Sequence, residues 1–250
     1  MLIGRASNAV IPTERHRALA NGLKSQLFMC GLGGAYQNLW WRQRSRNRSP
    51  WTDWNREKRA VFVHVPKNAG TSVYASLDIK APRETHCTAY GYKTSDPGAW
   101  QDAFTFGFVR NPWDRFVSAF HYLKHQPLSR DDAQWCQQVL SPFDDFSQFA
   151  IAMRDRSFRS SVLMWRHFSP QCYYFSDLRG HLIVDYLARF ERISEEFEFL
   201  GKKLNVDVSE KRENAVERAP YQGYYDDTLR DIVGRVYARD IQLFGYRFDD

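Results

Sequence analysis

Two segments with the same succession of elements constrain the fold of this chain more than any other feature. Residues 60–65 (AVFVHV) form a short apolar run, followed by a turn that contains Gly70 and by a segment of helical character. Residues 104–109 (FTFGFV) repeat this order before the turn Arg110-Asn111 and a helix expected over 112–125. Short apolar runs of this kind are typical of buried parallel strands. Strands that alternate with helices predict an α/β, three-layer fold with a central, mainly parallel sheet flanked by helices.

The rest of the chain continues this alternation. Ser141 suits an N-cap, and Pro142 suits the first position of a helix that runs to residue 154. Residues 226–244 have the apolar period of an amphipathic helix. Its apolar face consists of Leu229, Ile232, Val233, Val236 and Tyr237. The other elements that we expect are helices around 14–28 and at 194–204, and strands at 172–175 and 181–190.

The positive charge of the chain is concentrated before the first strand. Residues 1–59 hold 11 of the 35 Lys and Arg but only 3 of the 29 Asp and Glu, so their net charge is +8 against +6 for the whole chain. The sequence therefore predicts a basic, Trp/Arg-rich N-terminal appendage at 1–59 and a main domain at 60–250. Because the main domain is not basic, we expect no nucleic-acid partner.

Two interpretations of the appendage stay open. Four of the eight tryptophans lie beside its arginines, namely Trp40, Trp41, Trp51 and Trp54. They either pack onto the main domain or contact an anionic polymer or a membrane surface. The sequence shows no transmembrane run and no secretory signal, which leads us to expect a cytoplasmic protein, with peripheral membrane contact left open. The four cysteines form no CxxC pair, so we expect free thiols and no zinc site.

The first strand–turn–helix junction, from His64 to Ser72, has the composition of an anion site. Backbone N–H groups and the positive end of a helix dipole gather at such a junction. Gly70 permits close approach of the backbone to a ligand, while Lys67 adds a full positive charge. The pattern is not the nucleotide-binding GxxxxGK[ST], because the lysine precedes the glycine by three residues. No carboxylate cluster suited to Mg²⁺ accompanies it, so we expect no metal.

The second junction places another anion-binding residue at a strand end. Arg110 offers a planar fork of donors that suits a phosphate. Ser118 follows eight residues later in the expected helix and adds a hydroxyl. Two anion sites at neighbouring strand ends indicate a ligand with two separate anionic groups.

Together, the segments HVPKNAGTS (64–72) and FVRNPWDRFVSAF (108–120) resemble the paired motifs of sulfotransferases that use 3′-phosphoadenosine 5′-phosphosulfate (PAPS). The chain is most similar to carbohydrate sulfotransferases of the heparan 2-O and chondroitin 4-O type. The resemblance covers roughly residues 60–250 and implies a P-loop-like fold. Residues 184–200 and 224–246 match more loosely.

This resemblance implies a role for each motif residue. The loop that holds the 5′-phosphosulfate would consist of Lys67, Asn68, Ala69, Gly70, Thr71 and Ser72. Lys67 would also stabilise the charge that grows on the leaving phosphate, without a metal. Arg110 and Ser118 would hold the 3′-phosphate, and the product would be adenosine 3′,5′-bisphosphate.

Transfer to a hydroxyl also needs a base, and histidine is the usual one near neutral pH. His86 is our first candidate, because the resembling enzymes use a histidine in the interval between the two motifs. His64 is the rival candidate. His167 is a weaker candidate for lining the acceptor pocket.

The sequence thus predicts a metal-independent O-sulfotransferase that modifies a hydroxyl of a glycan, a glycolipid or another hydroxyl-bearing acceptor. Two alternatives are a P-loop nucleotide kinase or related phosphotransferase, and a non-enzymatic protein that binds an anionic polymer. The lysine position argues against the first. Deletion of residues 1–59 would test the second.

Overall fold

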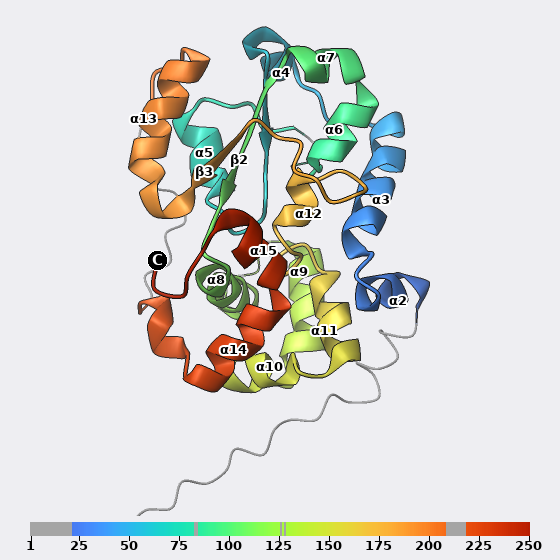
Figure 1. The fold of residues 1–250 in the computed structure, drawn as a ribbon, viewed down its shortest axis with the longest axis vertical. Helices are drawn as coiled ribbons and strands as arrows, with labels where there is room; N and C mark the ends of the chain where they lie inside the picture. Colours follow the sequence, from blue (N-terminus) through green and yellow to red (C-terminus); the bar gives the residue numbers. More distant parts are fainter. Residues whose placement is uncertain (1–21, 83–84, 126, 128, 209–218) are drawn as a thin grey trace, which may run out of the picture.

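The computed structural model describes residues 22–82, 85–125, 127, 129–208 and 219–250. A parallel sheet in the order β1-β2-β3 lies at the centre of the molecule (Figure 1). Its strands are β1 (Ala60–Val63), β2 (Phe104–Val109) and β3 (Tyr186–Arg189). Phe106 of β2 is in register with Phe62 of β1 and with Tyr186 of β3. The α/β fold with a parallel sheet and flanking helices is therefore confirmed.

Alternate residues of the strands pack into different layers. One face of the sheet contributes Phe62, Phe106 and Phe108 to a cluster with residues of α5 (Gly70–Ser76) and α13 (Ile193–Leu204). The other face contributes Val61, Val63 and Val109 to a second cluster. That face is covered by α3 (Gly33–Asn47), α6 (Ala89–Ser95) and α12 (Cys172–Phe175) (Figure 1).

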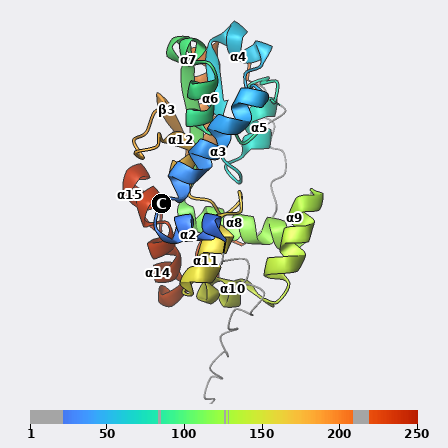
Figure 2. The same ribbon diagram turned by 90° about the vertical axis from the view of Figure 1, so that its right-hand side faces the viewer.

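A helical layer lies beyond the carboxyl ends of the strands (Figures 1 and 2). Its centre is α8 (Pro112–His125), and its core is rich in aromatic rings. Phe116 stacks on Phe149 at 5.4 Å between ring centroids, and Phe168 packs against both rings. The other helices of this layer are α9 (Arg130–Trp135), α10 (Phe146–Ala152), α11 (Arg156–Leu163) and α14 (Asp227–Val236).

Shorter helices complete the described part of the chain. Of these, α2 (Leu23–Met29) packs against α11, α4 (Asp53–Lys58) precedes the first strand, and α7 (Pro97–Asp102) precedes the second. The chain also forms a π-helical turn at Cys136–Leu140, 3-10 turns at Phe190–Arg192 and Tyr221–Tyr224, and a last helix, α15 (Ala238–Phe244). None of the described helices is both long and apolar enough to cross a membrane.

Several sequence predictions are confirmed by these bounds. The strand at 104–109 and the helix at 112–125 have the predicted ends. The helix at 194–204 begins one residue earlier, at Ile193. The strand predicted at 181–190 is limited to β3, with an isolated bridge between Ser176 and Leu182. The first helix, predicted around 14–28, lies partly outside the described residues.

The strand predicted at 172–175 is wrong, because these residues form α12. The buried carboxylate of Asp240 accepts hydrogen bonds from the backbone N–H groups of Gln171 and Cys172, at 2.7 and 2.9 Å. A carboxylate in that position caps the start of a helix. Gly107 lets α12 approach the sheet, because a Cβ there would lie 2.2 Å from the ring of Phe175.

Two predicted helices have different ends. The helix predicted from Ser141 begins at Phe146 instead, because the side chain of Asp145 caps it by accepting from the Gln148 N–H at 2.9 Å. The helix predicted over 226–244 is interrupted at Tyr237. Tyr237 is buried and donates its hydroxyl to the carbonyl of Phe168 at 2.8 Å.

Candidate active site

The loop between β1 and α5 has a backbone conformation that its residue types seldom adopt. Lys67 and Ala69 both lie in the left-handed region, with φ of 71° and 57°. Such conformations cost free energy in residues other than glycine and persist where neighbouring contacts fix them. Position 70 requires a glycine, because a Cβ there would lie only 1.8 Å from Nε2 of His64. The His64 ring therefore closes one side of the loop.

Two buried side chains hold this loop against the rest of the fold. Asn68 donates from Nδ2 to the carbonyl of Phe108 at 2.6 Å and to Oε1 of Gln171 at 2.7 Å. Arg115 donates from Nε to the carbonyl of Pro66 at 3.0 Å and from Nη1 to that of Ser169 at 3.0 Å. The donor groups of the Asn68 side chain are thus occupied within the protein. Of the two hydroxyl residues, Thr71 is exposed and Ser72 is buried.

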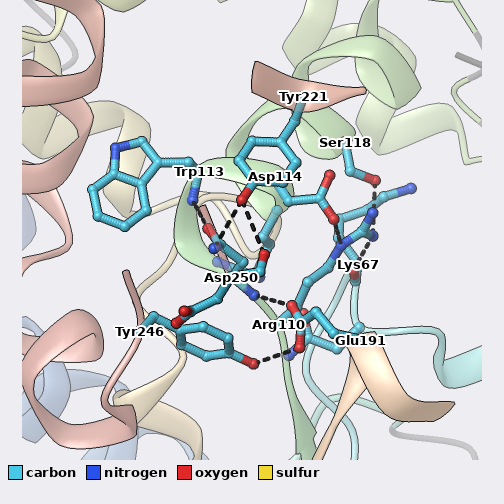
Figure 3. Close-up of polar contacts among 12 residues, drawn as sticks. Lys67, Arg110, Trp113, Asp114, Ser118, Glu191, Tyr221, Tyr246 and Asp250 are labelled. Carbon is cyan, nitrogen blue, oxygen red and sulfur yellow. Dashed lines mark hydrogen bonds and ion pairs between the residues drawn. The ribbon is translucent and has the colours of Figure 1, made fainter. Parts of the chain in front are cut away.

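Arg110 connects the two sequence motifs directly (Figure 3). Its Nη1 donates to the carbonyl of Lys67 at 2.9 Å and to Oγ of Ser118 at 3.3 Å. Its Nε donates to Asp114 at 2.6 Å, and the guanidinium lies 4.0 Å from the ring centre of Phe190. The structure therefore brings Lys67, Arg110 and Ser118 together, as an anion site built from both motifs requires.

A polar network supports the second junction from below (Figure 3). Asn111 donates its backbone N–H to Glu191 at 2.6 Å and its amide to the hydroxyl of Tyr221 at 3.1 Å. Glu191 also accepts from the hydroxyl of Tyr246 at 2.8 Å. Burial and the Glu191 carboxylate raise the pKa of Tyr246, so its hydroxyl keeps the proton that it donates. Such a network fixes the position from which Arg110 projects.

His64 and His86 form a close pair next to the loop. Their ring centroids are 4.5 Å apart. Burial, followed by the charges of His64, His167 and Arg166, lowers the pKa of His86 well below its usual value. Burial, followed by the charge of His167, lowers the pKa of His64 to about 3. Both rings are therefore neutral near pH 7.

The sequence analysis missed a cluster of charged and polar side chains beside the loop. Its centre is the carboxylate of Asp132. This carboxylate is 3.0 Å from Nε2 of His167 and 2.7 Å from Nη2 of Arg166. The hydroxyl of Tyr122 donates to it at 3.1 Å, and Nζ of Lys67 lies 4.1 Å from the centre of the Tyr122 ring. These groups come from Lys67, from residues 122–132 and from residues 166–167. The three segments are far apart in the chain, so no local sequence pattern predicts that they meet.

The electrostatics of this group follow from burial and pairing. Burial lowers the pKa of His167 to about 4, against the opposing effect of Asp132. For Asp132, burial alone would raise the pKa, but hydrogen bonds from His167 and Ser129 and the charge of Arg166 hold it below its usual value. Asp132 is thus a permanent negative charge that orients His167 and Arg166.

Two cavities lie on either side of the histidine pair. One, of about 520 Å³, is lined by His64, Thr71 and Tyr74. The other, of about 350 Å³, is lined by His86, by Arg166 and by side chains of α2 and α3. Thr85 lines both cavities. His64 and His86 therefore face different spaces, although their rings are in contact.

A metal site needs several His, Cys, Asp or Glu side chains close together. Within the described ranges, no group of three or more His, Cys, Asp or Glu side chains is placed to hold a metal ion. The four cysteines are free thiols, with Cys87 and Cys172 buried.

Comparison with known proteins places this geometry in a family. The sequence model of the sulfotransferase family matches residues 52–247, which is most of the chain. No curated protein and no solved structure matches it. The helices α2 and α3 precede the matched range.

Proposed function

Because the chain belongs to the sulfotransferase family, we propose that it transfers a sulfuryl group from PAPS to a hydroxyl of a carbohydrate or glycan-containing acceptor. The observation that carries this proposal is the contact of Arg110 with the carbonyl of Lys67 and with Ser118. It joins the two motifs, which lie about forty residues apart, into one basic site. A donor with two anionic groups needs such a site. We also propose residues 60–250 as the sulfotransferase domain and residues 1–59 as an accessory segment.

The donor would be held by groups with complementary charge. Arg110 and Ser118 are proposed to bind the 3′-phosphate, since a guanidinium and a hydroxyl that already touch form a preorganised anion site. The backbone of residues 67–72 and the Lys67 ammonium are proposed to bind the 5′-phosphosulfate. PAPS supplies an activated sulfuryl group on a phosphate leaving group.

In this proposal the protein positions the reactants and accepts the proton of the acceptor hydroxyl. The acceptor oxygen forms a bond to sulfur while the bond from sulfur to the phosphate oxygen breaks. The proton of the hydroxyl moves to an imidazole nitrogen of His86. Lys67 stabilises the negative charge that develops on the departing adenosine 3′,5′-bisphosphate, which is the role that a metal ion has in kinases.

His86 is the proposed base because of its position. Burial keeps the ring neutral before the reaction but also makes uptake of a proton costly, so the low pKa by itself does not favour it. His86 lines the cavity that α2 and α3 help to form, whereas His64 lines the other one. His64 remains the alternative base, since its ring contacts that of His86.

Calorimetric titration with adenosine 3′,5′-bisphosphate, without metal, tests the donor site. We expect the wild-type protein to bind with micromolar affinity, about −8 kcal/mol. Arg110→Ala should weaken binding roughly 100-fold, because a charge-assisted pair of hydrogen bonds to phosphate is lost. Arg235→Ala, at an exposed position of α14, is the matched control and should bind normally.

A folded wild-type protein that fails to bind the bisphosphate would contradict the proposal. Magnesium-dependent turnover of ATP in the same sample would instead favour the kinase alternative. Binding of a heparin-like polymer without transfer activity, lost on deletion of residues 1–59, would favour the non-enzymatic alternative.

A further inference from the structure

The cavity beside His86 has walls from distant parts of the chain. One wall comes from α2 and α3, and the opposite wall comes from the segment between α11 and α12. His86 and Thr85 form a third side. Its volume of about 350 Å³ lies at the lower end of the range for small-molecule sites. This space suits one or two rings rather than a long polymer segment.

Six of the thirteen lining residues are aromatic, and one of these rings is held in place by another ring. Phe28, Tyr36, Trp40 and Trp165 all line the cavity. The Trp165 ring stacks on Trp135 at 5.4 Å between centroids, with the ring planes only 8° apart. Trp40 keeps 44% of its surface exposed. Flat apolar walls of this kind bind ring faces with little loss of side-chain freedom.

The charged residues of the lining are both cations. They are Lys24 and Arg166, and no carboxylate lines the cavity. Lys24 is exposed, and its Nζ lies 5.7 Å from the centre of the ring of Tyr36, which also lines the cavity. Arg166 is held by hydrogen bonds from Nη2 to Asp132 and Ser129, and its guanidinium lies 4.8 Å from the centre of the Trp165 ring. An anionic ligand would pair with these two cations.

The wall formed by α2 and α3 is fixed to the main domain. Ser160 donates its hydroxyl to the carbonyl of Ser25 at 2.7 Å. Asn38 donates from Nδ2 to the carbonyl of Ser176 at 2.8 Å, and Ser169 donates to Gln37 at 2.9 Å. These contacts are buried or partly buried, so the two helices are a built part of the cavity. The family match begins only at residue 52, so this wall is additional to the matched region.

From these observations we infer that the cavity is the acceptor site and that it takes an anionic glycoside with an apolar aglycone. The aglycone ring packs on Trp40 and Trp165, the anionic group pairs with Lys24 and Arg166, and the reacting hydroxyl faces His86. This inference rests on the proposed function, because it names the acceptor of that reaction. The lining also holds the polar residues Gln37, Thr85 and Ser169, which suit the hydroxyls of the sugar.

Calorimetry with three matched probes on the full chain, with adenosine 3′,5′-bisphosphate bound, tests the inference. 4-Nitrophenyl β-glucuronide has both the anion and the apolar ring. 4-Nitrophenyl β-glucoside lacks the anion, and methyl β-glucuronide lacks the apolar ring. We expect the first probe to bind about 10-fold or more tighter than either of the others, since each missing contact is of the order of a charge-assisted hydrogen bond or an aromatic contact.

Two variants assign the contacts to residues. Lys24→Gln should weaken the nitrophenyl glucuronide about 10-fold and leave the nitrophenyl glucoside unchanged. Trp40→Ala should weaken both nitrophenyl glycosides and leave methyl glucuronide nearly unchanged. Arg46→Gln is the control, because Arg46 is exposed on α3 and does not line the cavity.

Titration of each sample with adenosine 3′,5′-bisphosphate separates the two hypotheses. If the bisphosphate binds but all three glycosides fail to bind, the acceptor inference is overturned while the donor site stands. Equal affinity of Lys24→Gln and wild type for the nitrophenyl glucuronide would overturn it as well. If the bisphosphate does not bind to the wild type, the proposed function itself fails.

Discussion

The two sides of the candidate active site are built in different ways. The donor side comes from two short junctions, 66–72 and 110–118, each at the end of a strand. Its side chains are held largely by backbone carbonyls, as with Asn68 and Arg115. The acceptor side combines α2, α3, Thr85-His86 and the segment after α11. The proposed donor site is thus built from local sequence motifs, whereas the proposed acceptor site depends on how distant segments meet.

The charges of the two sides differ as well. On the donor side, Arg110 is paired with Asp114 within one helical turn. On the acceptor side, Asp132 holds Arg166 and His167 from 34 and 35 residues away. Ion pairs of the first kind are visible in sequence spacing, whereas the second kind appears only after the chain has folded.

The largest expected effect lies where the two sides meet, at His86. His86→Asn should lower kcat about 10²- to 10⁴-fold, because the reaction loses its general base. Binding of adenosine 3′,5′-bisphosphate should be unchanged, since that residue does not hold the donor. Steady-state transfer assays and calorimetry measure both quantities. His125→Asn, at an exposed position near the end of α8, is the control.

If His64→Asn lowers kcat and His86→Asn does not, the proton acceptor belongs to the cavity that His64 lines. The acceptor would then bind on the α5 side of the histidine pair.

Substitution of Lys67 should give the next largest loss of kcat, without a change in binding of the acceptor. Lys67→Met should lower kcat about 10²- to 10³-fold, because the leaving phosphate loses a positive charge that acts on the transition state. The KM for the acceptor should hardly change. Lys93→Met, at an exposed position of α6, controls for loss of surface charge. A large rise in acceptor KM with normal kcat would instead place Lys67 on the acceptor side.

Asn68 tests how firmly the donor loop is anchored. Asn68→Ala should lower the free energy of unfolding by about 2 kcal/mol, because it removes two buried hydrogen bonds, to the carbonyl of Phe108 and to Oε1 of Gln171. Urea denaturation measures this change. Asn47→Ala, at an exposed position of α3, should change stability by less than about 0.5 kcal/mol. Equal stability of the two variants would show that the loop does not need this anchor.

Per pH unit, the smallest effect that we expect is a pH dependence of stability from the acceptor side. The pKa of His167 is about 4 in the folded protein, below the usual 6.5, so only the unfolded chain takes up this proton between pH 6.5 and 4. Stability is therefore full above pH 6.5 and falls on acidification by at most about 1.4 kcal/mol per pH unit for this group. The window between pH 6.5 and 4 lies above the pH at which Asp132 takes up a proton, because the pKa of Asp132 is held below its usual value.

Thermal unfolding between pH 7 and pH 4.5 measures this dependence. His167→Gln should reduce the slope without abolishing it, because His64 and His86 also have lowered pKa values. His181→Gln, at an exposed position, should leave the slope as in the wild type. An unchanged slope in His167→Gln would show that the ring is not buried as the structure has it.

Local sequence patterns predicted much of the donor side. The bounds of β2 and α8 follow from an apolar run and from Pro112, whose missing N–H is tolerated in the first helical turn. The two motifs predicted two anion sites at neighbouring strand ends, and the structure adds that Arg110 contacts both the carbonyl of Lys67 and Ser118. Gly70 was assigned to ligand approach, and the structure adds that the His64 ring occupies the space of its side chain.

Other features could not be predicted from local patterns. Residues 172–175 have the composition of a strand but form α12, because Asp240 caps the helix from almost seventy residues away. The role of Asp132 as the partner of His167 was missed for the same reason. Trp41 and Trp51 are buried in the cluster on one face of the sheet, while Trp40 is largely exposed at the cavity.

The sequence by itself determined the alternation of strands and helices and the two anion-binding junctions, because period, turn residues and charge act within a few residues of one another. Only the tertiary structure decided which histidine borders which cavity and which side chains line the proposed acceptor site. Those features depend on burial and on hydrogen bonds between segments more than a hundred residues apart, such as Asn38 with Ser176. Such contacts form only when the whole chain has packed, so no local sequence pattern predicts them.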